Sequence, residues 1–109
     1  MIEITIFNKS EKIIAIQVKG HSGYAEEGSD IICSAVSTLA QNCEIGLKEL
    51  LKIQTNFVRN PKLPLLSVAL PNDLSEQEIH DSQIIMKSTR LGLKKLADSY
   101  PKYINIKEK

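Results

Sequence analysis

Hydrophobic and polar residues alternate along the first part of the chain. Residues 2–7 place isoleucines on one side of an extended segment and polar or charged residues on the other. Residues 12–19 alternate again, and we expect Ile14, Ile16 and Val18 to share one face. Because only a short polar link separates the two segments, the pattern predicts a β-hairpin.

Two longer segments repeat their hydrophobic residues at spacings of three or four, which is typical of helices with one buried face. The first is expected from about residue 30 to about residue 51, with Cys43 on its apolar stripe. The second is expected over residues 75–99, where Ser75 and Glu78 have the spacing of a capping box.

Further strands are predicted near residues 53–59 and 64–70, with Pro61 in the turn between them. Residues 103–106 are a weaker candidate for one more short strand. The element order is then ββαββα. It favours a single domain over residues 1–109, of the α+β class and in two layers: a mostly antiparallel four-stranded sheet with both helices packed on one face.

Composition narrows the classes of function. The chain has 109 residues, and its fourteen basic and thirteen acidic residues leave a net charge of +1. Proteins built mainly to hold nucleic acid usually show a dominant basic field, which this chain lacks. No apolar stretch approaches the roughly 20 residues that span a bilayer, and the N-terminus does not look like a signal peptide. We therefore expect a cytoplasmic protein that needs neither a membrane nor direct contact with nucleic acid.

The two cysteines fall in different settings on the first predicted helix. Residues 33 and 43 would lie about 15 Å apart along the helix axis, too far for a disulfide, which needs Cα atoms within about 7 Å. Cys43 is expected to be a small buried hydrophobe. Cys33 is expected in the first turn, where unpaired N–H groups and the helix dipole favour a thiolate, the nucleophilic form. The same N–H groups could receive an oxyanion.

A nucleophile also needs a base, and His21 is the candidate. It follows the second strand and opens a glycine-rich segment that leads into the helix of Cys33. Histidine takes and returns a proton near neutral pH, and Cys–His pairs recur in acyl transfer. Asp30 could orient the imidazole or only cap the helix, and the spacing leaves both roles open. Since no Cys-x-x-Cys or His-x-x-x-His spacing occurs, we expect no metal and no cofactor.

Residues 20–25, GHSGYA, and 28–37, GSDIICSAVS, resemble the signature of Prp, the family of ribosomal-processing cysteine proteases. The resemblance extends over the whole chain in length and element order. It implies a nucleophile at Cys33 and a catalytic histidine at His21, with Asp30 and Ser37 at further motif positions. It also implies a loop over the active site that contacts the substrate through Ser22, Gly23, Tyr24, Glu26, Glu27 and Gly28.

The resemblance further implies a biological role. Members of this family are homodimers that remove a short N-terminal extension from the large-subunit ribosomal protein L-twenty-seven, a step of ribosome maturation. Apolar residues off the main stripe of the last predicted helix, Ile84 and Leu91, are consistent with a symmetric interface between two copies.

A non-catalytic ribosome-assembly or RNA-binding factor is the alternative. It would contact phosphates through basic residues spread along the chain, namely Lys19, Lys48, Lys52, Arg59 and Lys62. The near-neutral net charge and the scarcity of aromatic residues disfavour this alternative.

Overall fold

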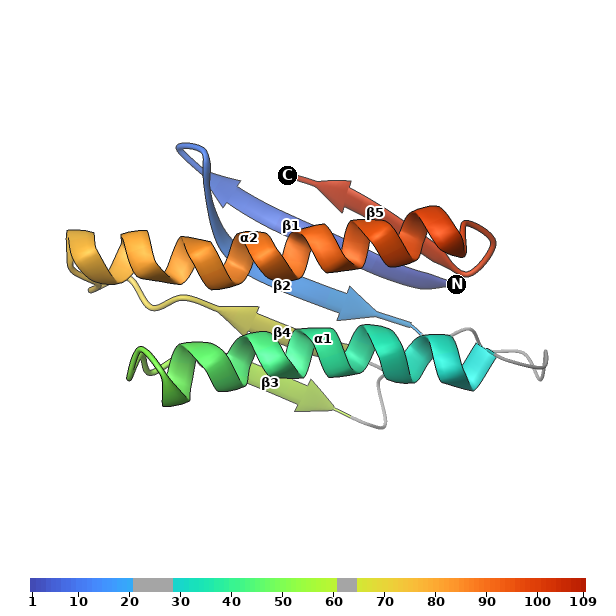
Figure 1. The fold of residues 1–109 in the computed structure, drawn as a ribbon, viewed down its shortest axis with the longest axis horizontal. Helices are drawn as coiled ribbons and strands as arrows, with labels where there is room; N and C mark the ends of the chain where they lie inside the picture. Colours follow the sequence, from blue (N-terminus) through green and yellow to red (C-terminus); the bar gives the residue numbers. More distant parts are fainter. Residues whose placement is uncertain (21–28, 61–64) are drawn as a thin grey trace.

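The computed structural model describes residues 1–20, 29–60 and 65–109, and only the backbone of residues 29 and 30. Two helices lie side by side and antiparallel, and both cover the same face of a sheet (Figure 1). The two-layer α+β arrangement is therefore confirmed. The elements, in order, are β1 (Ile2–Lys9), β2 (Lys12–Lys19), α1 (Ser29–Glu49), β3 (Asn56–Asn60), β4 (Leu65–Ala69), α2 (Glu76–Ser99) and β5 (Ile104–Glu108).

Within the described residues the sheet has five strands in the order β3-β4-β2-β1-β5, so the prediction of four strands was wrong. The fifth strand, β5, overlaps the weaker candidate at residues 103–106. Four of the strands pair antiparallel, but β5 pairs parallel with β1, from Ile2 opposite Ile104 onward. The sheet is therefore mixed. The pairing is parallel because α2 carries the chain back along the sheet before β5 begins, as in a crossover connection. Such a pairing depends on residues at opposite ends of the chain, which local alternation does not reveal.

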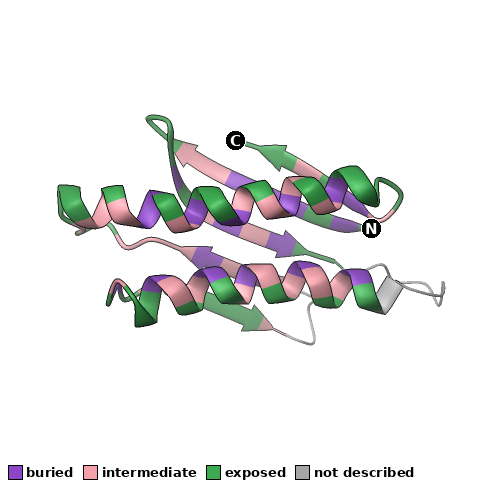
Figure 2. Cartoon of the chain, in the orientation of Figure 1, coloured by how far each residue is buried: buried purple, intermediate pink, exposed green. Residues whose placement is uncertain are grey.

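The core lies between the helices and the inner face of the sheet. Ile2, Ile4 and Ile6 of β1 are almost completely buried, as the alternation of that segment predicts. Buried residues recur along β1, β2 and β4 and along the sides of α1 and α2 that face the sheet (Figure 2). Aliphatic residues supply most of this core, together with Met86 and Cys43.

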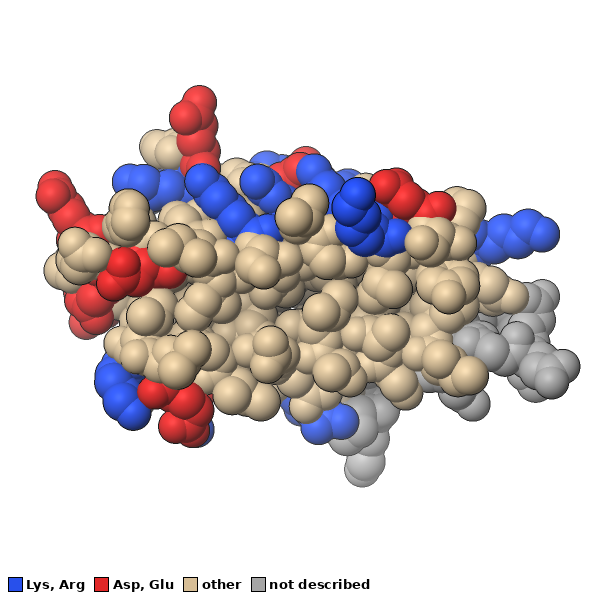
Figure 3. All heavy atoms as spheres, in the orientation of Figure 1, with Lys and Arg blue, Asp and Glu red and all other residues tan. Residues whose placement is uncertain are grey.

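The outer face of the helix layer carries few charges in its middle. Charged side chains gather towards its margins, and a broad uncharged area extends from α1 to α2 (Figure 3). Exposed large hydrophobic residues of the two helices include Ile31, Ile45, Ile84 and Leu91. Neither α1 nor α2, the helices of the described chain, has an apolar stretch long enough to cross a membrane.

A β-bulge changes which residues of β2 face the core. Phe7 pairs with Ala15 and Asn8 with Ile13, so Ile14 has no partner on β1. Ile13 is fully buried, whereas Ile14 is 39% exposed, so the prediction that Ile14 shares a face with Ile16 was wrong. One extra residue reverses the alternation beyond it.

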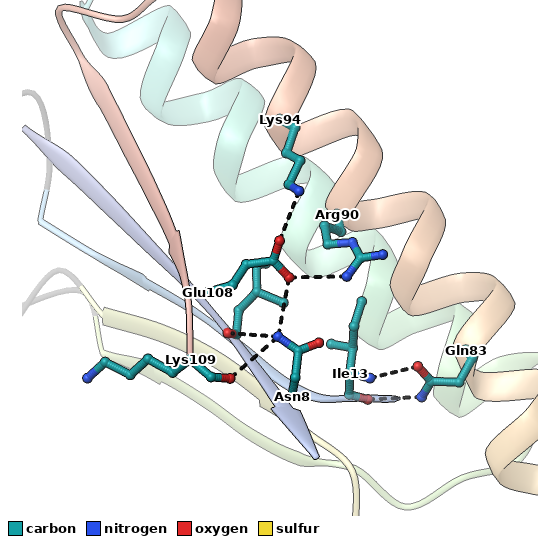
Figure 4. A network of polar contacts seen from close by, with 8 residues as sticks. Asn8, Ile13, Gln83, Arg90, Lys94, Glu108 and Lys109 are labelled. Atoms are coloured by element: carbon teal, nitrogen blue, oxygen red, sulfur yellow. Dashed lines mark hydrogen bonds and ion pairs between the residues drawn. The ribbon is translucent and has the colours of Figure 1, made fainter. Parts of the chain in front are cut away.

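The backbone at the bulge is held by a side chain of α2. The N–H of Ile13 donates to Gln83 Oε1 at 2.7 Å, and Gln83 Nε2 donates to the carbonyl of Ile13 at 2.9 Å (Figure 4). Both polar groups of the buried residue are therefore satisfied, which burial away from water requires.

α2 begins with a capping box formed by Ser75 and Glu78. The N–H of Glu78 donates to Ser75 Oγ at 3.1 Å, and the N–H of Ser75 donates to Glu78 Oε1 at 3.0 Å. The predicted capping box is confirmed, and α2 ends at Ser99 as expected. α1 begins at Ser29 and ends at Glu49, slightly before the predicted ends.

Candidate active site

A cavity of about 200 Å³ opens where the first turns of α1 meet the ends of β2 and β3 and the starts of β1 and β4. Its walls are more apolar than polar, with five aliphatic residues and a few polar groups among them. The lining residues are Ile2, Val18, Gly20, Cys33, Val36, Ser37, Arg59, Asn60, Leu65 and Leu66. A largely apolar hollow with a few polar groups is the usual form of a binding site.

Gly20 directly follows the last residue of β2 and lines this cavity. Its φ of +79° lies in the left-handed region, and a Cβ built on it would stand 2.7 Å from the carbonyl oxygen of Met1. Only glycine fits both conditions, because a side chain there would collide with backbone that cannot move aside. Gly20 therefore allows the start of β1 and the end of β2 to close one side of the cavity.

Cys33 contributes a half-buried thiol to the cavity wall. Because α1 begins at Ser29, Cys33 is its fifth residue and follows the first turn, whereas the sequence placed it in that turn. The reason is that α1 already includes Ser29, whereas the sequence predicted a helix from about residue 30. The N–H groups that lack acceptors within the helix are those of the preceding turn.

Cys43 has the structural role that the sequence predicts. Its side chain is 1% exposed, and its Sγ lies 3.4 Å from Met86 Sδ, between α1 and α2. Burial raises the pKa of the Cys43 thiol above its usual value, so this thiol stays protonated and unreactive. Both cysteines are thiols, and no disulfide joins them.

Ser37 follows Cys33 by one helical turn and lines the same cavity. Gln41 Nε2 donates a hydrogen bond to Ser37 Oγ at 2.7 Å, and Arg59 Nη1 donates to Gln41 Oε1 at 3.3 Å. A line of polar contacts therefore joins β3 to the helix that carries Cys33.

Several predicted site residues are not tested by the structure. His21 and the predicted substrate loop, residues 22–28, lie outside the described residues, and the side chain of Asp30 does too. The structure therefore brings together Cys33 and Ser37 of the predicted set. Within the described part of the chain, no group of three His, Cys, Asp or Glu side chains could hold a metal ion.

Sequence reasoning missed the part of the site that the sheet contributes. Arg59, considered there only as a phosphate contact, lines the cavity, as do Asn60 and Leu66. Alternation along β3 and β4 could have shown which residues share a face. It could not show that these strands end beside α1, because that follows from the order of strands in the sheet.

Solved structures share this fold. A protein from Streptococcus mutans has a TM-score of 0.82 and is 24% identical, covering 99% of this chain and 93% of its own. The essential ribosomal processing protease Prp from S. aureus, in complex with a substrate peptide, has a TM-score of 0.86 and 17% identity, with full coverage of both chains. At these identities the similarity establishes the architecture.

Sequence comparison establishes the family. The ribosomal processing cysteine protease Prp of Mycoplasma genitalium is 30% identical to this chain over 90 residues, which are 83% of each protein. The sequence model of the family described as cysteine protease Prp matches residues 1–105. The cavity that contains Cys33 is thus found in a chain that belongs to the cysteine protease Prp family.

Proposed function

We propose that this member of the Prp family is an endopeptidase whose nucleophile is Cys33 and whose general base is His21. The observation that carries the assignment is the half-buried thiol of Cys33 in the wall of a largely apolar cavity. The cavity, of about 200 Å³, is smaller than the roughly 300–1,000 Å³ of pockets that enclose a drug-sized ligand. It suits a side chain of an extended peptide better than a whole small molecule.

The substrate that we propose is the N-terminal extension of the large-subunit ribosomal protein L-twenty-seven, removed in the cytoplasm during ribosome maturation. Two relatives support this choice. The M. genitalium protein is a ribosomal processing protease, and the S. aureus protease of the same fold binds a substrate peptide. The single domain over residues 1–109 would then carry both the peptide site and the catalytic groups.

The proposed reaction is acyl transfer through a thioester. His21 takes the thiol proton, and the Cys33 sulfur attacks the scissile carbonyl carbon. As the C–N bond breaks, His21 gives the proton to the leaving amine; water then cleaves the thioester and releases the acid. N–H groups at the start of α1 would stabilise the oxyanion, because the first turn of a helix has donors without partners within it. No step needs a metal or a cofactor.

We assign supporting roles to the remaining motif residues. Ser37 lines the cavity with Cys33 and would contact the peptide there. Asp30 would orient the imidazole of His21, and the loop of residues 22–28 would contact the bound substrate.

Mass spectrometry of an extended ribosomal-protein N-terminal peptide tests the proposal. Wild-type protein should release the extension, whereas Cys33→Ser and His21→Ala proteins should lose at least about 100-fold in rate, the range for a lost acid–base group or nucleophile. Cys43→Ala is the matched control, since it removes the other thiol and should keep cleaving. A Cys33→Ser protein that cleaves at the wild-type rate would exclude the mechanism.

The distribution of basic residues speaks against the RNA-binding alternative. Lys19 and Arg59 lie near the cavity, opposite neighbouring residues of β4, whereas Lys48 is in the last turn of α1. Residues 33 and 48 of this helix are separated by about 22 Å at 1.5 Å per residue. Lys19, Arg59 and Lys48 therefore do not form one compact patch. Binding to bare rRNA that weakens steeply with salt would instead support the alternative.

We also propose that two copies associate through the outer face of the helix layer. Ile31 and Ile45 of α1 are 75% and 52% exposed, and Ile84 and Leu91 of α2 are 64% and 61% exposed. Spacings of fourteen and seven residues place each pair on one side of its helix. The middle of this face is uncharged (Figure 3), which suits a symmetric contact in which each surface meets its own copy.

A further inference from the structure

Three residues form a hydrogen-bonded chain beside the cavity, and the proposed mechanism uses only one of them. Arg59 on edge strand β3 donates to Gln41 Oε1 at 3.3 Å, and Gln41 Nε2 donates to Ser37 Oγ at 2.7 Å. On α1, residues 33, 37 and 41 follow one another at intervals of four, so they lie along one side of the helix. Arg59 and Ser37 both line the cavity with Cys33.

The register of the sheet explains how an arginine on an exposed strand reaches this helix. Arg59 pairs with Leu66, and Leu66 pairs with Val18. Leu66 and Val18 are buried and belong to the row that faces the helices. Arg59 continues that row at the edge of the sheet, where its side chain meets α1 instead of pointing to the opposite face.

The chemistry of the three groups fixes the direction of every hydrogen bond. A guanidinium has donors and no acceptor, so it must face the oxygen of the Gln41 amide. The amide nitrogen then faces Ser37 and donates to its hydroxyl oxygen. Since a hydroxyl has a single proton, Ser37 must direct that proton away from Gln41, either to a carbonyl of its own helix or to an acceptor in the cavity.

We propose that Arg59 is a positioning residue for the peptidase: through Gln41 it keeps the Ser37 hydroxyl a donor towards a carbonyl oxygen of the bound peptide. The inference rests on the proposed function, because it assumes that a peptide occupies this cavity. If Arg59 is removed, the Gln41 amide can turn over, and its oxygen then accepts the Ser37 proton. The peptide carbonyl loses its donor although Ser37 is still present.

A double-mutant cycle on kcat/KM, with the extended ribosomal-protein peptide as substrate, tests the coupling. Arg59→Ala and Ser37→Ala should each lower kcat/KM by roughly 3- to 10-fold, the effect of one neutral hydrogen bond. Together they should lower it no further than Ser37→Ala alone, since both changes remove the same donor. Arg59→Lys, which still donates to Gln41, should recover most of the activity.

Gln41→Glu separates positioning from structural support. A carboxylate still accepts from Arg59, and the ion pair should preserve the thermal stability of the protein. It has no proton to give, so Ser37 would donate to it and not to the peptide. We expect kcat/KM to fall as far as in Ser37→Ala, with an unchanged melting temperature. Val58→Ala, on the same strand, and Asn42→Ala, on the same helix, are the matched controls and should behave as wild type.

Two results would overturn the inference: multiplicative effects of Arg59→Ala and Ser37→Ala, or a Gln41→Glu protein with wild-type kcat/KM. A Cys33→Ala protein measured in parallel separates this failure from that of the function. If Cys33→Ala is inactive while the cycle is multiplicative, only the role of Arg59 fails. If Cys33→Ala still cleaves the peptide, the proposed function fails with it.

Discussion

At the scale of single residues, the two cysteines of α1 differ chiefly in their surroundings. Cys33 stands in the wall of a cavity, and Cys43 is enclosed between the two helices. We expect iodoacetamide to alkylate Cys33 in the native protein, because its side chain is within reach of solvent. Cys43 should react more than about 100-fold more slowly, since it is exposed only when the protein opens.

Digestion and mass spectrometry of the two cysteine-containing peptides measure this difference. Protein unfolded in urea is the control, and there both cysteines should react at similar rates. Equal labelling in the native protein would contradict the burial of Cys43 and the raised pKa of its thiol.

Gly20 is a residue of the cavity wall whose backbone conformation does not accommodate a side chain. Gly20→Ala places a Cβ 2.7 Å from the Met1 carbonyl oxygen at a φ of +79°, and it should lower the free energy of unfolding by at least about 1 kcal/mol. Gly46→Ala is the control: its Cβ would meet only the Ile85 side chain at 3.4 Å, and alanine favours a helix by up to about 1 kcal/mol. Urea unfolding of both variants gives the comparison, and equal midpoints would contradict the strain at Gly20.

At the scale of elements, the carboxylate of Glu108 links β5 to α2 through two ion pairs. Glu108 accepts from Lys94 Nζ at 2.9 Å and from Arg90 Nη1 at 3.1 Å, and Asn8 Nδ2 donates to it at 3.2 Å (Figure 4). Two hydrogen bonds lower the pKa of Glu108 below its usual value of 4.5: the one from Lys94 has the larger effect, and the one from Asn8 the smaller. The group is solvent-exposed, so the contribution to stability is small.

The lowered pKa of Glu108 determines in which direction the stability of the protein changes with pH. In the folded protein Glu108 holds its proton less tightly than in the unfolded chain, so its contribution is present above about pH 4.5 and is lost as the pH falls through the folded pKa. The melting temperature of wild-type protein should therefore fall more steeply below pH 4.5 than that of Glu108→Gln. Parallel curves for the two proteins would show that these contacts add nothing.

Local sequence patterns predicted the helices and most of the strands. Contacts between residues far apart in the sequence determined features that these patterns did not predict, such as the orientation of Ile14 and the place of Arg59 in the site. The hairpin and the capping box of α2 involve neighbours in the sequence, and both were predicted. The reversed orientation of Ile14 depends on a bulge that Gln83 of α2 holds. The signature around Cys33 located the nucleophile candidate, whereas Arg59 joined the site only through the order of the strands.

At the scale of the whole molecule, the proposed association of two copies through the outer face of the helix layer can be tested by placing a charge on that face. Leu91→Glu places a charge within the proposed contact, and in a symmetric dimer the two copies of that charge meet or are buried together. We expect the dimer to dissociate, with the weight-average mass in sedimentation falling to that of one 12.2 kDa chain. Lys107→Glu, at an exposed position of β5 outside the helix layer, is the control. Wild-type protein that sediments as a monomer at micromolar concentration would contradict the interface.

The central claim is that the sulfur of Cys33 forms a bond with the substrate. It is tested most directly by acid-quenching the protein during turnover of the extended ribosomal-protein peptide and measuring the intact mass. We predict an adduct equal to the N-terminal fragment held as a thioester, located on the peptide that contains Cys33 and absent from Cys33→Ala. An adduct on another residue, or full cleavage by Cys33→Ala with no adduct, would contradict the claim.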